Sequence, residues 1–461
     1  MCRFREERDI GPYVVRSCPR TARYYGVILG VASVLMLHLI ACVSKVSGMS
    51  LSSLGGDREK VVSKIPVALQ LDLKIRAAQH GVDIQHAVEA GIEAWRGLGS
   101  NLASIDTSGA KSFSTFLPSG QWDSFRGDCA SRGVSIIQGL AQSVQMWLET
   151  NPAPTVVRPE HPKRVVVCNQ KGGVGKTAIT AGTGEALAED ANQLHPVRIS
   201  KHFAAALSED DSDSPLDYED LPGLGMRVLL VDFDPQCHLT KQLGQEPLPL
   251  EGDSLTKHMA GESKGQLRDL IVPIEGARFG DRLHLLPACT DAFLLDVKLS
   301  GVRAREAALE RALSAVEDDY DAVLIDCPPS LGLSMDAAAY YGRRRPEEAP
   351  GNSGVLVVVQ AEDSSADAYG LLTSQIEDLR NDMHLELDYL GIVVNHYDAR
   401  RGYIATSSLE SWMDIKDPRV VGVIGDLKEQ KEAVRVKQPL LAYSPRCDQS
   451  VGMRALAREI S

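Results

Sequence analysis

The sequence predicts an α/β protein with a doubly wound, mostly parallel sheet, preceded by a smaller α-rich region. Three apolar runs typical of buried parallel strands lie at 164–168, 227–231 and 320–325, and each is followed by polar or charged residues. Stretches of helical composition separate them, which is the alternation expected of such a sheet. Upstream, between residues 49 and 155, a strand–helix–helix pattern occurs twice. We therefore expect a sheet domain over 162–461 and a separate N-terminal region.

Composition bounds the kind of protein. The chain has 461 residues, of which 44% are hydrophobic, enough for two or three domains with their own cores. A formal net charge of −13 argues against binding nucleic acid by bulk attraction, so any such contact must come from local patches. The nine cysteines form no CxxC pair, which favours reduced cytosolic thiols over a metal site. An acidic run at 208–213 is typical of a solvated loop.

A glycine-rich loop follows the first apolar run and ends in Lys176 and Thr177. The backbone N–H groups of such a loop, backed by a helix N-terminus, form a site for phosphate groups. Lys176 is expected to reach the β- and γ-phosphates of a nucleotide, and the Thr177 hydroxyl to bind Mg²⁺. The usual pattern has a glycine at the position of Gln170, and this chain carries a second lysine, Lys171, beside it. The residues expected to cradle the phosphates are Gly172, Gly173, Val174, Gly175, Lys176, Thr177 and Ala178.

Carboxylates follow the next two apolar runs. Asp232 and Asp234 are two residues apart, so strand alternation points them the same way at the C-terminal end of their strand. Asp326 ends the third run, and we expect it to hold Mg²⁺ directly or through water. In an open α/β sheet this edge is where ligands bind. A strand-end aspartate could instead cap the following helix, but Pro328 and Pro329 argue against this for Asp326.

Together the glycine loop and the aspartates resemble the deviant Walker A loop and its partners in the ParA/MinD family of ATPases, over the whole sheet domain. The resemblance implies ATP as the nucleotide and Mg²⁺ as its metal, with Thr177, Asp232 and Asp326 around the metal. It implies that Asp234 orients the attacking water and that Lys171 reaches across to the nucleotide of a partner subunit. Two chains would then form a homodimer that sandwiches ATP and separates after hydrolysis.

Two further positions concern the adenine base. Asn395 follows a fourth apolar run, at 389–394, and the family pattern would place it against an adenine edge. The chain departs from the family after the next run. Relatives usually carry Ile-Pro where this sequence has Ile424-Gly425-Asp426, so adenine packing is expected to differ there.

The resemblance implies segregation of plasmid or chromosomal DNA in a bacterium, by a cytoplasmic, nucleoid-associated protein. The ATP-bound dimer would bind DNA without sequence preference, and its partner would be a small centromere-binding protein of the ParB kind. Two alternatives stay open. One is a MinD-like positioning ATPase on a membrane, which the short and weakly amphipathic tail at 451–461 disfavours. The other is an ATP-gated repressor in which the N-terminal repeat binds its own operator.

Basic residues near the C-terminus are the candidates for nonspecific DNA binding. A mixed-charge helix surface explains them equally well. They are Arg400, Arg401, Lys431, Arg435 and Lys437.

An internal repeat organises residues 49–155. The stretch 65–71 alternates like a strand, Asp72 is placed to cap a short helix, and a second helix is predicted over 82–95. Fifty-two residues later the pattern returns, with Trp147 matching Trp95 and Leu117-Pro118 matching Ile65-Pro66. The repeat therefore predicts two copies of one strand–helix–helix unit.

A unit of this kind resembles a ribbon–helix–helix DNA-binding fold. Such units pair and insert a two-stranded ribbon into the major groove, and a tandem repeat could supply the pair within one chain. The outward residues of the first strand would be Ala68 and Gln70, with Lys64 just ahead, and the second strand would include Ser119 and Gly120. A helical region for dimerisation or partner docking is at least as well supported by the sequence.

An apolar stretch lies near the N-terminus. Residues 24–43 are nearly uncharged and long enough to span a bilayer. Arginines precede the stretch, and the positive-inside rule would then export the ATPase domain to a compartment poor in ATP. Met49 opens an ordinary polar start, so residues 1–48 are expected to be a mis-assigned start, with a signal anchor of opposite orientation as the alternative. We therefore expect no stable membrane association.

Two insertions interrupt the sheet domain, at 190–225 and 342–351. Neither breaks a motif, so both are expected to be surface loops. The second contains three consecutive arginines, 343–345, which either contact DNA or form a solvated turn.

Overall fold

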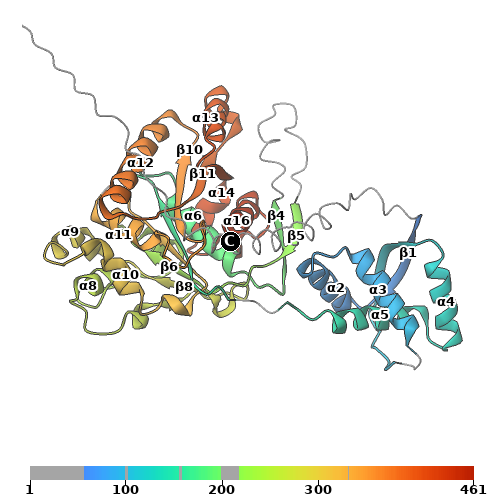
Figure 1. Cartoon of the computed structure of the whole chain (residues 1–461). Helices are drawn as coiled ribbons and strands as arrows, with labels where there is room; N and C mark the ends of the chain where they lie inside the picture. Colours follow the sequence, from blue (N-terminus) through green and yellow to red (C-terminus); the bar gives the residue numbers. More distant parts are fainter. Residues whose placement is uncertain (1–56, 99–101, 155–157, 199–217, 331) are drawn as a thin grey trace, which may run out of the picture.

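The chain folds into a large sheet domain and a smaller N-terminal unit beside it (Figure 1). The apolar stretch at 24–43, the start at Met49 and the acidic run at 208–213 lie outside the described residues. Within the described part, no helix has both the length and the apolar character needed to cross a membrane. This computed structural model describes residues 57–98, 102–154, 158–198, 218–330 and 332–461.

An eight-stranded sheet forms the centre of the large domain, in the order β12-β11-β10-β3-β9-β6-β8-β7. Every neighbouring pair is parallel except β7 with β8. The strand of this sheet that comes first in the chain, β3, lies between β10 and β9, so connections leave it toward both sides of the sheet. The strands are β3 (Lys163–Cys168), β6 (Val228–Asp232), β7 (Val272–Pro273), β8 (Leu283–Leu286), β9 (Ala322–Asp326), β10 (Gly354–Gln360), β11 (Tyr389–Tyr397) and β12 (Val420–Gly425).

Alternate residues of the strands point into two separate apolar cores, one on each face of the sheet. On β3, Val166 belongs to the first core, whereas Val165 and Val167 belong to the second. This alternation, with both faces covered by helices, confirms the predicted doubly wound sheet.

Helices of the two faces come from different parts of the chain. The second core is covered by α6 (Lys176–Ala188), α7 (His238–Gln242), α14 (Lys428–Arg435), α15 (Leu440–Tyr443) and α16 (Asp448–Ile460). The first core is covered by α8 (Leu255–Ala260), α9 (Leu295–Lys298), α10 (Ala308–Leu313), α11 (Leu333–Gly342), α12 (Asp363–Met383) and α13 (Tyr403–Asp414). Short 3-10 turns are η3 (Leu267–Leu270), η4 (Gly280–Arg282), η5 (Thr290–Leu294), η6 (Arg305–Ala307), η7 (Glu317–Asp319) and η8 (Ala399–Arg401).

The first insertion is more than the loop that the sequence predicted. It contains two antiparallel strands, β4 (Leu194–Arg198) and β5 (Tyr218–Pro222), which form a small sheet of their own. The C-terminal helix α16 holds this pair in place, since Arg454 Nη1 donates to the carbonyl of Pro196 at 3.0 Å. The described residues of the insertion, 190–198 and 218–225, are therefore part of the folded domain.

The arginines of the second insertion are engaged within the fold. Arg343 pairs with Glu310 at 2.9 Å and Arg345 with Glu317 at 2.8 Å. Arg344 pairs with Glu386. These guanidinium groups are less than a quarter exposed, so the solvated-turn prediction is wrong. Their positive charges are paired with acidic side chains of the protein and are therefore not available to DNA phosphates.

The N-terminal unit contains the predicted repeat. Each copy is a strand followed by two helices, and β1 pairs antiparallel with β2. The elements are β1 (Arg58–Ile65), α2 (Val67–Gln79), α3 (Ile84–Gly97), β2 (Lys111–Pro118), α4 (Gln121–Ser131) and α5 (Ile136–Thr150).

The strands of the repeat lie earlier than the sequence suggested. β1 ends at Ile65, and Pro66, which has no N–H to donate to a strand ladder, opens α2. Ala68 and Gln70 therefore lie on a helix, and Asp72 lies inside that helix rather than at its cap. Ser119 and Gly120 likewise form the turn after β2. The apolar residues of 65–71 also match a helical stripe, because Leu69 and Leu73 are both buried.

The two second helices of the repeat, α3 and α5, pack closely at the centre of the unit. A Cβ on Gly91 would lie 2.5 Å from the carbonyl oxygen of Ser143, so only glycine permits this approach. Trp95 is 1% exposed and donates from Nε1 to Gln142 Oε1 at 3.0 Å. Each copy of the repeat thus buries its apolar face against the other.

Candidate nucleotide-binding site

The glycine loop turns sharply between β3 and α6. Gly173 has φ +78° and Gly175 has φ +87°, and both conformations favour glycine. A Cβ on Gly175 would lie 2.1 Å from Asn395 Nδ2, so this position also lacks space for a side chain. Nothing lies within 4 Å of a Cβ built on Gly172 or Gly173. The backbone there is open to an incoming group.

Lys176 folds back over the loop that precedes it. Its side-chain nitrogen donates to the carbonyl of Lys171 at 3.2 Å, and the residue is 7% exposed. Burial lowers the pKa of Lys176, while Asp326 opposes this shift. A cation held at the mouth of the loop is placed to meet an anionic ligand.

Asp326 lies beside this lysine at the end of β9. Its Oδ1 accepts a hydrogen bond from Thr180 Oγ1 at 3.3 Å, and its Oδ2 is buried without a hydrogen-bond partner among the described residues. Burial raises the pKa of Asp326 well above its usual range, Asp232 raises it further, and a hydrogen bond with the Thr177 side chain lowers it. A buried carboxylate with an orphaned oxygen next to a threonine hydroxyl fits a hard cation.

Asp232 is opposite Asp326 in the register of neighbouring strands. Its carboxylate accepts from Thr240 N at 2.8 Å, from Thr240 Oγ1 at 2.6 Å and from Asp234 N at 3.3 Å. Burial raises its pKa to about 6, although the bonds from Thr240 lower it. These bonds fix the turn after β6, so Asp232 positions Asp234.

Asp234 borders a small hollow beside the turn that follows β9. Its Oδ1 accepts from Gln236 N at 2.9 Å. The hollow has a volume of about 280 Å³ and is lined also by Phe293, Pro328 and Ser330. The predicted loop and the three predicted aspartates thus come together at one edge of the sheet.

Lys171 lies at the rim of the loop, in a charged group. Its side-chain nitrogen pairs with Glu362 Oε2 at 2.9 Å, and Arg401 approaches the same carboxylate at 3.5 Å. Asp426 pairs with Arg401 at 3.5 Å and with Lys431 at 2.8 Å. Two of the residues predicted to contact DNA therefore lie in the ion-pair group that contains Lys171.

Asn395 is 2% exposed at the end of β11. Its Nδ2 donates to the carbonyl of Val174 at 2.9 Å, so the amide stabilises the glycine loop. The predicted contact with adenine would have to use the other side of the amide.

Sequence reasoning missed three polar residues that support the loop. Gln360 Nε2 donates to the carbonyl of Gly173 at 3.3 Å and lies 2.9 Å from His396 Nδ1. Asn169 donates to the carbonyl of Val358 at 2.6 Å and accepts from the amide of Lys171 at 3.0 Å. The available signal was the one used for the aspartates, namely polar residues at the ends of adjacent strands.

No group of three or more metal-ligating side chains of the His, Cys, Asp and Glu types occurs among the described residues. A magnesium ion bound through one hydroxyl, one carboxylate and the phosphates of a ligand needs no such group, because Mg²⁺ keeps several waters. The threonine hydroxyl and the aspartate carboxylate at this edge of the sheet are therefore sufficient protein ligands for a magnesium ion that is bound together with a nucleotide.

Comparison with known proteins identifies relatives over most of the chain. A family model described as an AAA domain matches residues 219–388. Protein Rv1708 of Mycobacterium tuberculosis is 30% identical over 322 residues, 67% of this chain and 81% of its own length. The chromosome-partitioning ATPase Soj of Thermus thermophilus is 32% identical over 240 residues, 52% of this chain and 71% of its own length. The chromosome partitioning protein ParA of Caulobacter vibrioides is 27% identical, covering 65% and 94%.

Among solved structures, a complex of Cyanothece McdA with ATP covers 65% of this chain and 97% of its own, with 16% identity and a TM-score of 0.49. Cobyrinic acid a,c-diamide synthase from Mycobacterium smegmatis, solved with a bound ATP analog and magnesium, covers 61% and 91%, with 26% identity and a TM-score of 0.43.

The sequence relatives settle the classification. Thermus Soj exceeds 30% identity, and the match spans more than two thirds of its length. The glycine loop with its two lysines and the strand-end aspartates agree with this relationship. The chain is a member of the ParA/Soj/MinD family of P-loop ATPases.

Proposed function

We propose that this protein uses ATP to partition plasmid or chromosomal DNA. The observation that carries the proposal is the placement of two lysines, Lys171 and Lys176, on one glycine loop beside the strand-end aspartates. The open backbone at Gly172 and Gly173 would accept the triphosphate, and Lys176 would neutralise its charge.

Magnesium fits the same edge of the sheet. The Thr177 hydroxyl and the unpartnered oxygen of Asp326 would hold it, with Asp232 behind them. When bound, the metal would neutralise charge on the β- and γ-phosphate oxygens. Asp234, fixed by the hydrogen bonds of the β6–α7 turn, would orient the attacking water.

Lys171 would connect two subunits. Its ammonium group now pairs with the half-exposed Glu362 carboxylate, a contact that costs little to exchange at the surface. In the ATP-bound dimer it would instead contact the phosphates held by the partner chain. Hydrolysis removes the γ-phosphate charge and would release the two chains.

DNA binding by this dimer would use basic residues around η8 and α14. The side chains of Arg400 and Lys431 are 83% and 70% exposed, although they pair with Asp398 and Asp426. Ion pairs of such exposed cations exchange readily for phosphates. A small centromere-binding protein of the ParB kind would stimulate hydrolysis.

The membrane-positioning alternative requires an amphipathic C-terminal helix that can leave the fold. Helix α16 instead buries Val451, Met453 and Leu456. Met453 and Leu456 belong to the core that α6 also covers. The apolar face of α16 is therefore occupied, which favours partition over membrane positioning.

The test is ATP turnover by the wild type and by Lys176→Ala, each with and without nonspecific DNA. We expect slow basal turnover, an increase when DNA and the partner are both present, and no turnover in the variant. Lys416→Ala serves as a matched control, because Lys416 is exposed after α13 and donates to the carbonyl of Met413, away from the nucleotide loop. Unchanged turnover in Lys176→Ala would overturn the site assignment.

A further inference from the structure

The two repeats of the N-terminal unit join their strands into one antiparallel ribbon. Arg58 pairs with Pro118 at one end, and Ile65 pairs with Lys111 at the other. Equivalent residues of the repeats are 52 positions apart in sequence, so Val62 corresponds to Ser114, which is also its partner across the ribbon. The central pair therefore lies on a local two-fold axis, and a single chain completes the ribbon.

One face of the ribbon is exposed. The opposite face is buried, and its side chains, which include Val61 and Ile65, belong to the core of the unit. Val62 and Phe116 are 61% and 49% exposed, although both are apolar. The exposed side chains that alternate with this buried set are Lys60, Val62, Lys64, Ser112, Ser114 and Phe116, and we call them the ribbon face. Lys111 at the start of β2 is exposed too, but alternation assigns it to the opposite face with Phe113.

Positive charge on the ribbon face is confined to one strand. Lys60 and Lys64 lie on β1, whereas their equivalents on β2 are Ser112 and Phe116. No ion pair within the described part of the chain involves either lysine. The one acid in the two strands, Glu59, accepts a hydrogen bond from Gly120 N at 3.2 Å on the other side. In a chain with a net charge of −13, the ribbon face is thus a local cationic surface without acidic partners among the described residues.

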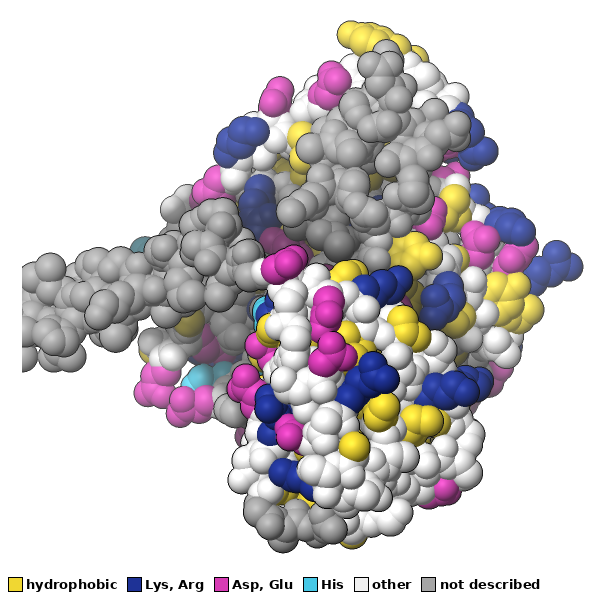
Figure 2. Space-filling model, turned by 90° about the vertical axis from the view of Figure 1, so that its right-hand side faces the viewer, with side chains coloured by type: hydrophobic (Ala, Val, Ile, Leu, Met, Phe, Trp, Pro, Cys, Tyr) yellow, Lys and Arg dark blue, Asp and Glu magenta, His cyan; other side chains and the backbone are white. Residues whose placement is uncertain are grey.

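The described part of the sheet domain leaves this surface accessible. The unit contacts the sheet domain through α2, where Gln79 Nε2 donates to the carbonyl of Ala191 at 2.9 Å. The flank of the molecule that carries the unit shows Lys and Arg side chains interspersed with hydrophobic and acidic ones (Figure 2). Among the described residues, the side chains of the ribbon face therefore remain accessible to a large partner.

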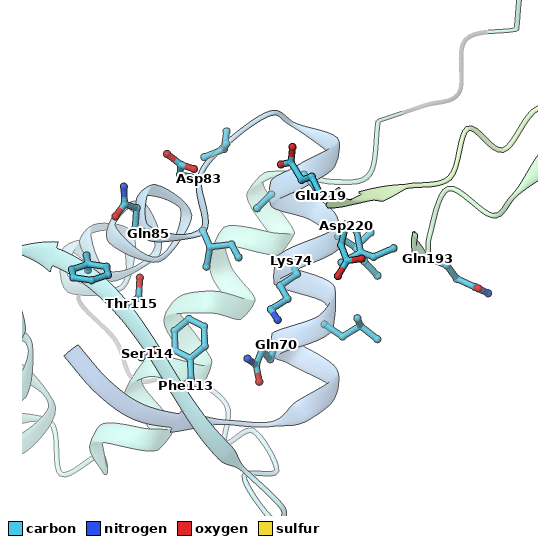
Figure 3. Close-up of a pocket in the computed structure, with 18 of the residues that line it drawn as sticks. Gln70, Lys74, Asp83, Gln85, Phe113, Ser114, Thr115, Gln193, Glu219 and Asp220 are labelled. Carbon is cyan, nitrogen blue, oxygen red and sulfur yellow. The ribbon is translucent and has the colours of Figure 1, made fainter. Parts of the chain in front are cut away.

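A groove runs along β2 beside the ribbon face. It has a volume of about 1130 Å³, and Lys74 and Gln70 line it from α2, near Ser114 (Figure 3). The acids Glu219 and Asp220, which also line it, come from β5 of the sheet domain. Asp83 of the N-terminal unit and Arg446 of the sheet domain line the groove as well, so its charges are mixed. The ribbon face, rather than the groove, is therefore the surface that would attract a polyanion.

A two-stranded antiparallel ribbon matches the width of the DNA major groove. Lysine ammonium groups suit guanine O6 and N7 or phosphates, serine hydroxyls suit several base edges, and apolar side chains suit the thymine methyl group. We propose that the ribbon face of a single chain binds duplex DNA in the major groove and reads a non-palindromic sequence. The sequence is non-palindromic because equivalent positions on the two strands carry different chemistry.

This site is separate from the nucleotide loop, so its test does not depend on the proposed partition function. Nucleotide-free, full-length protein is used to select from a random duplex library, and affinity for the selected duplex is measured by fluorescence anisotropy. Lys60→Ala with Lys64→Ala is expected to weaken binding by about ten- to a hundredfold. ATP turnover should stay unchanged. Arg126→Ala, an exposed cation on α4, serves as the control and should bind like the wild type.

Exchanging the two strands' residues tests the asymmetry. The exchange combines Lys60→Ser with Ser112→Lys and Lys64→Phe with Phe116→Lys, which preserves composition and moves both lysines to β2. The selected sequence is expected to reverse its orientation relative to the protein, as footprinting with a tethered cleavage reagent would report. Circular dichroism melting would verify that the exchanged ribbon still folds.

Three outcomes would overturn the proposal. The first is a library without an enriched sequence. The second is a Lys60→Ala, Lys64→Ala variant that binds the selected duplex within about twofold of the wild type. The third is a palindromic sequence bound by two chains, which would show that the ribbon acts as half of a dimer rather than as a complete reader.

Discussion

At the scale of single residues, the nucleotide site depends on a few side chains with distinct duties. Lys176 faces inward over the glycine loop, whereas Lys171 lies at the rim in contact with Glu362. Asp326 keeps an orphaned oxygen, whereas the oxygens of Asp232 are occupied by the turn that follows it. Residues of the same type therefore differ in what they remain available to bind.

The two lysines should separate in their effects. Lys171→Ala should leave ATP binding by one chain nearly unchanged, because the loop amides and Lys176 remain. It should abolish ATP-dependent dimer formation and lower turnover at least about tenfold, since a partner contact is lost. Sedimentation velocity with and without ATP measures the first effect, and phosphate release measures the second. A dimer that forms equally well without Lys171 would contradict the role in trans.

Much of this site could be predicted from the sequence, because a phosphate loop and strand-end carboxylates are contiguous motifs with a fixed relation to the sheet. Gln360 and His396 could not be assigned in the same way. Each follows an apolar run, but only the parallel pairing of β10 with β11 brings them together under the loop. The hydrogen bonds from Thr240 to the Asp232 carboxylate, eight residues earlier, also could not be predicted, because they depend on the geometry of the turn between them.

At the scale of elements, α6 links the nucleotide loop to the far side of the domain. Glu185 on this helix is fully buried, and its Oε2 accepts from the backbone of Leu441 at 2.7 Å. Its Oε1 has no partner among the described residues. Burial raises the pKa of Glu185 to about 8. The helix thus docks onto α15 through a carboxyl group that folding tends to protonate.

This carboxyl group makes stability depend on pH. The folded protein binds the proton more tightly than the unfolded chain, so stability falls as pH rises from about 4.5 to about 8. Glu185→Gln keeps the acceptor for Leu441 and removes the ionisation. In the wild type this group should lower the unfolding free energy by roughly 3 kcal/mol between about pH 5 and about pH 8, and in the variant this pH-dependent decrease should be absent. Urea unfolding at both pH values measures this, with the half-exposed Glu262→Gln as a control that retains the wild-type dependence.

Element boundaries in the N-terminal unit were harder to predict than its repeat. The offset of the repeat is a property of the sequence alone, and both copies fold as strand–helix–helix. Residues 65–71, however, satisfy a strand and a helix pattern together, and Pro66 decides between them by ending the ladder. The hairpin of β4 and β5 escaped prediction because its short strands lie inside an insertion. It buries few apolar side chains, and those of β4 lie against α16, a contact that no local pattern reveals.

At the scale of the whole molecule, the C-terminal helix connects distant parts of the sheet domain. Arg454 is 3% exposed and binds both oxygens of Glu189, at 2.6 and 2.9 Å. The same guanidinium donates to the carbonyl of Pro445 at 2.7 Å. One buried ion pair thus joins α16, the end of α6 and the β4–β5 hairpin.

Removing one partner of this pair should be costly. Arg454→Met leaves the Glu189 carboxylate buried without its main counterion, which should lower the unfolding free energy by about 3–5 kcal/mol. Replacing both partners, with Arg454→Met and Glu189→Leu, should restore part of that loss, because the buried carboxylate is removed together with its main counterion. Arg278, which also pairs with Glu189 at 2.9 Å, is 24% exposed and can turn to water in the double variant. Chemical denaturation of the two single variants and the double variant gives the coupling energy. Additive losses would show that the pair contributes no more than its separate contacts.

The ribbon of the N-terminal unit has a consequence for stoichiometry. In proteins whose ribbon needs two chains, separation of the chains destroys it. Here both strands of the ribbon belong to one chain. Association of two chains therefore doubles the number of ribbons, and dissociation leaves both intact. Nucleotide-driven dimerisation of this protein would therefore raise the number of ribbons from one to two, and with it the number of duplex sites that one particle can bind. Each subunit would keep its own site when the dimer separates.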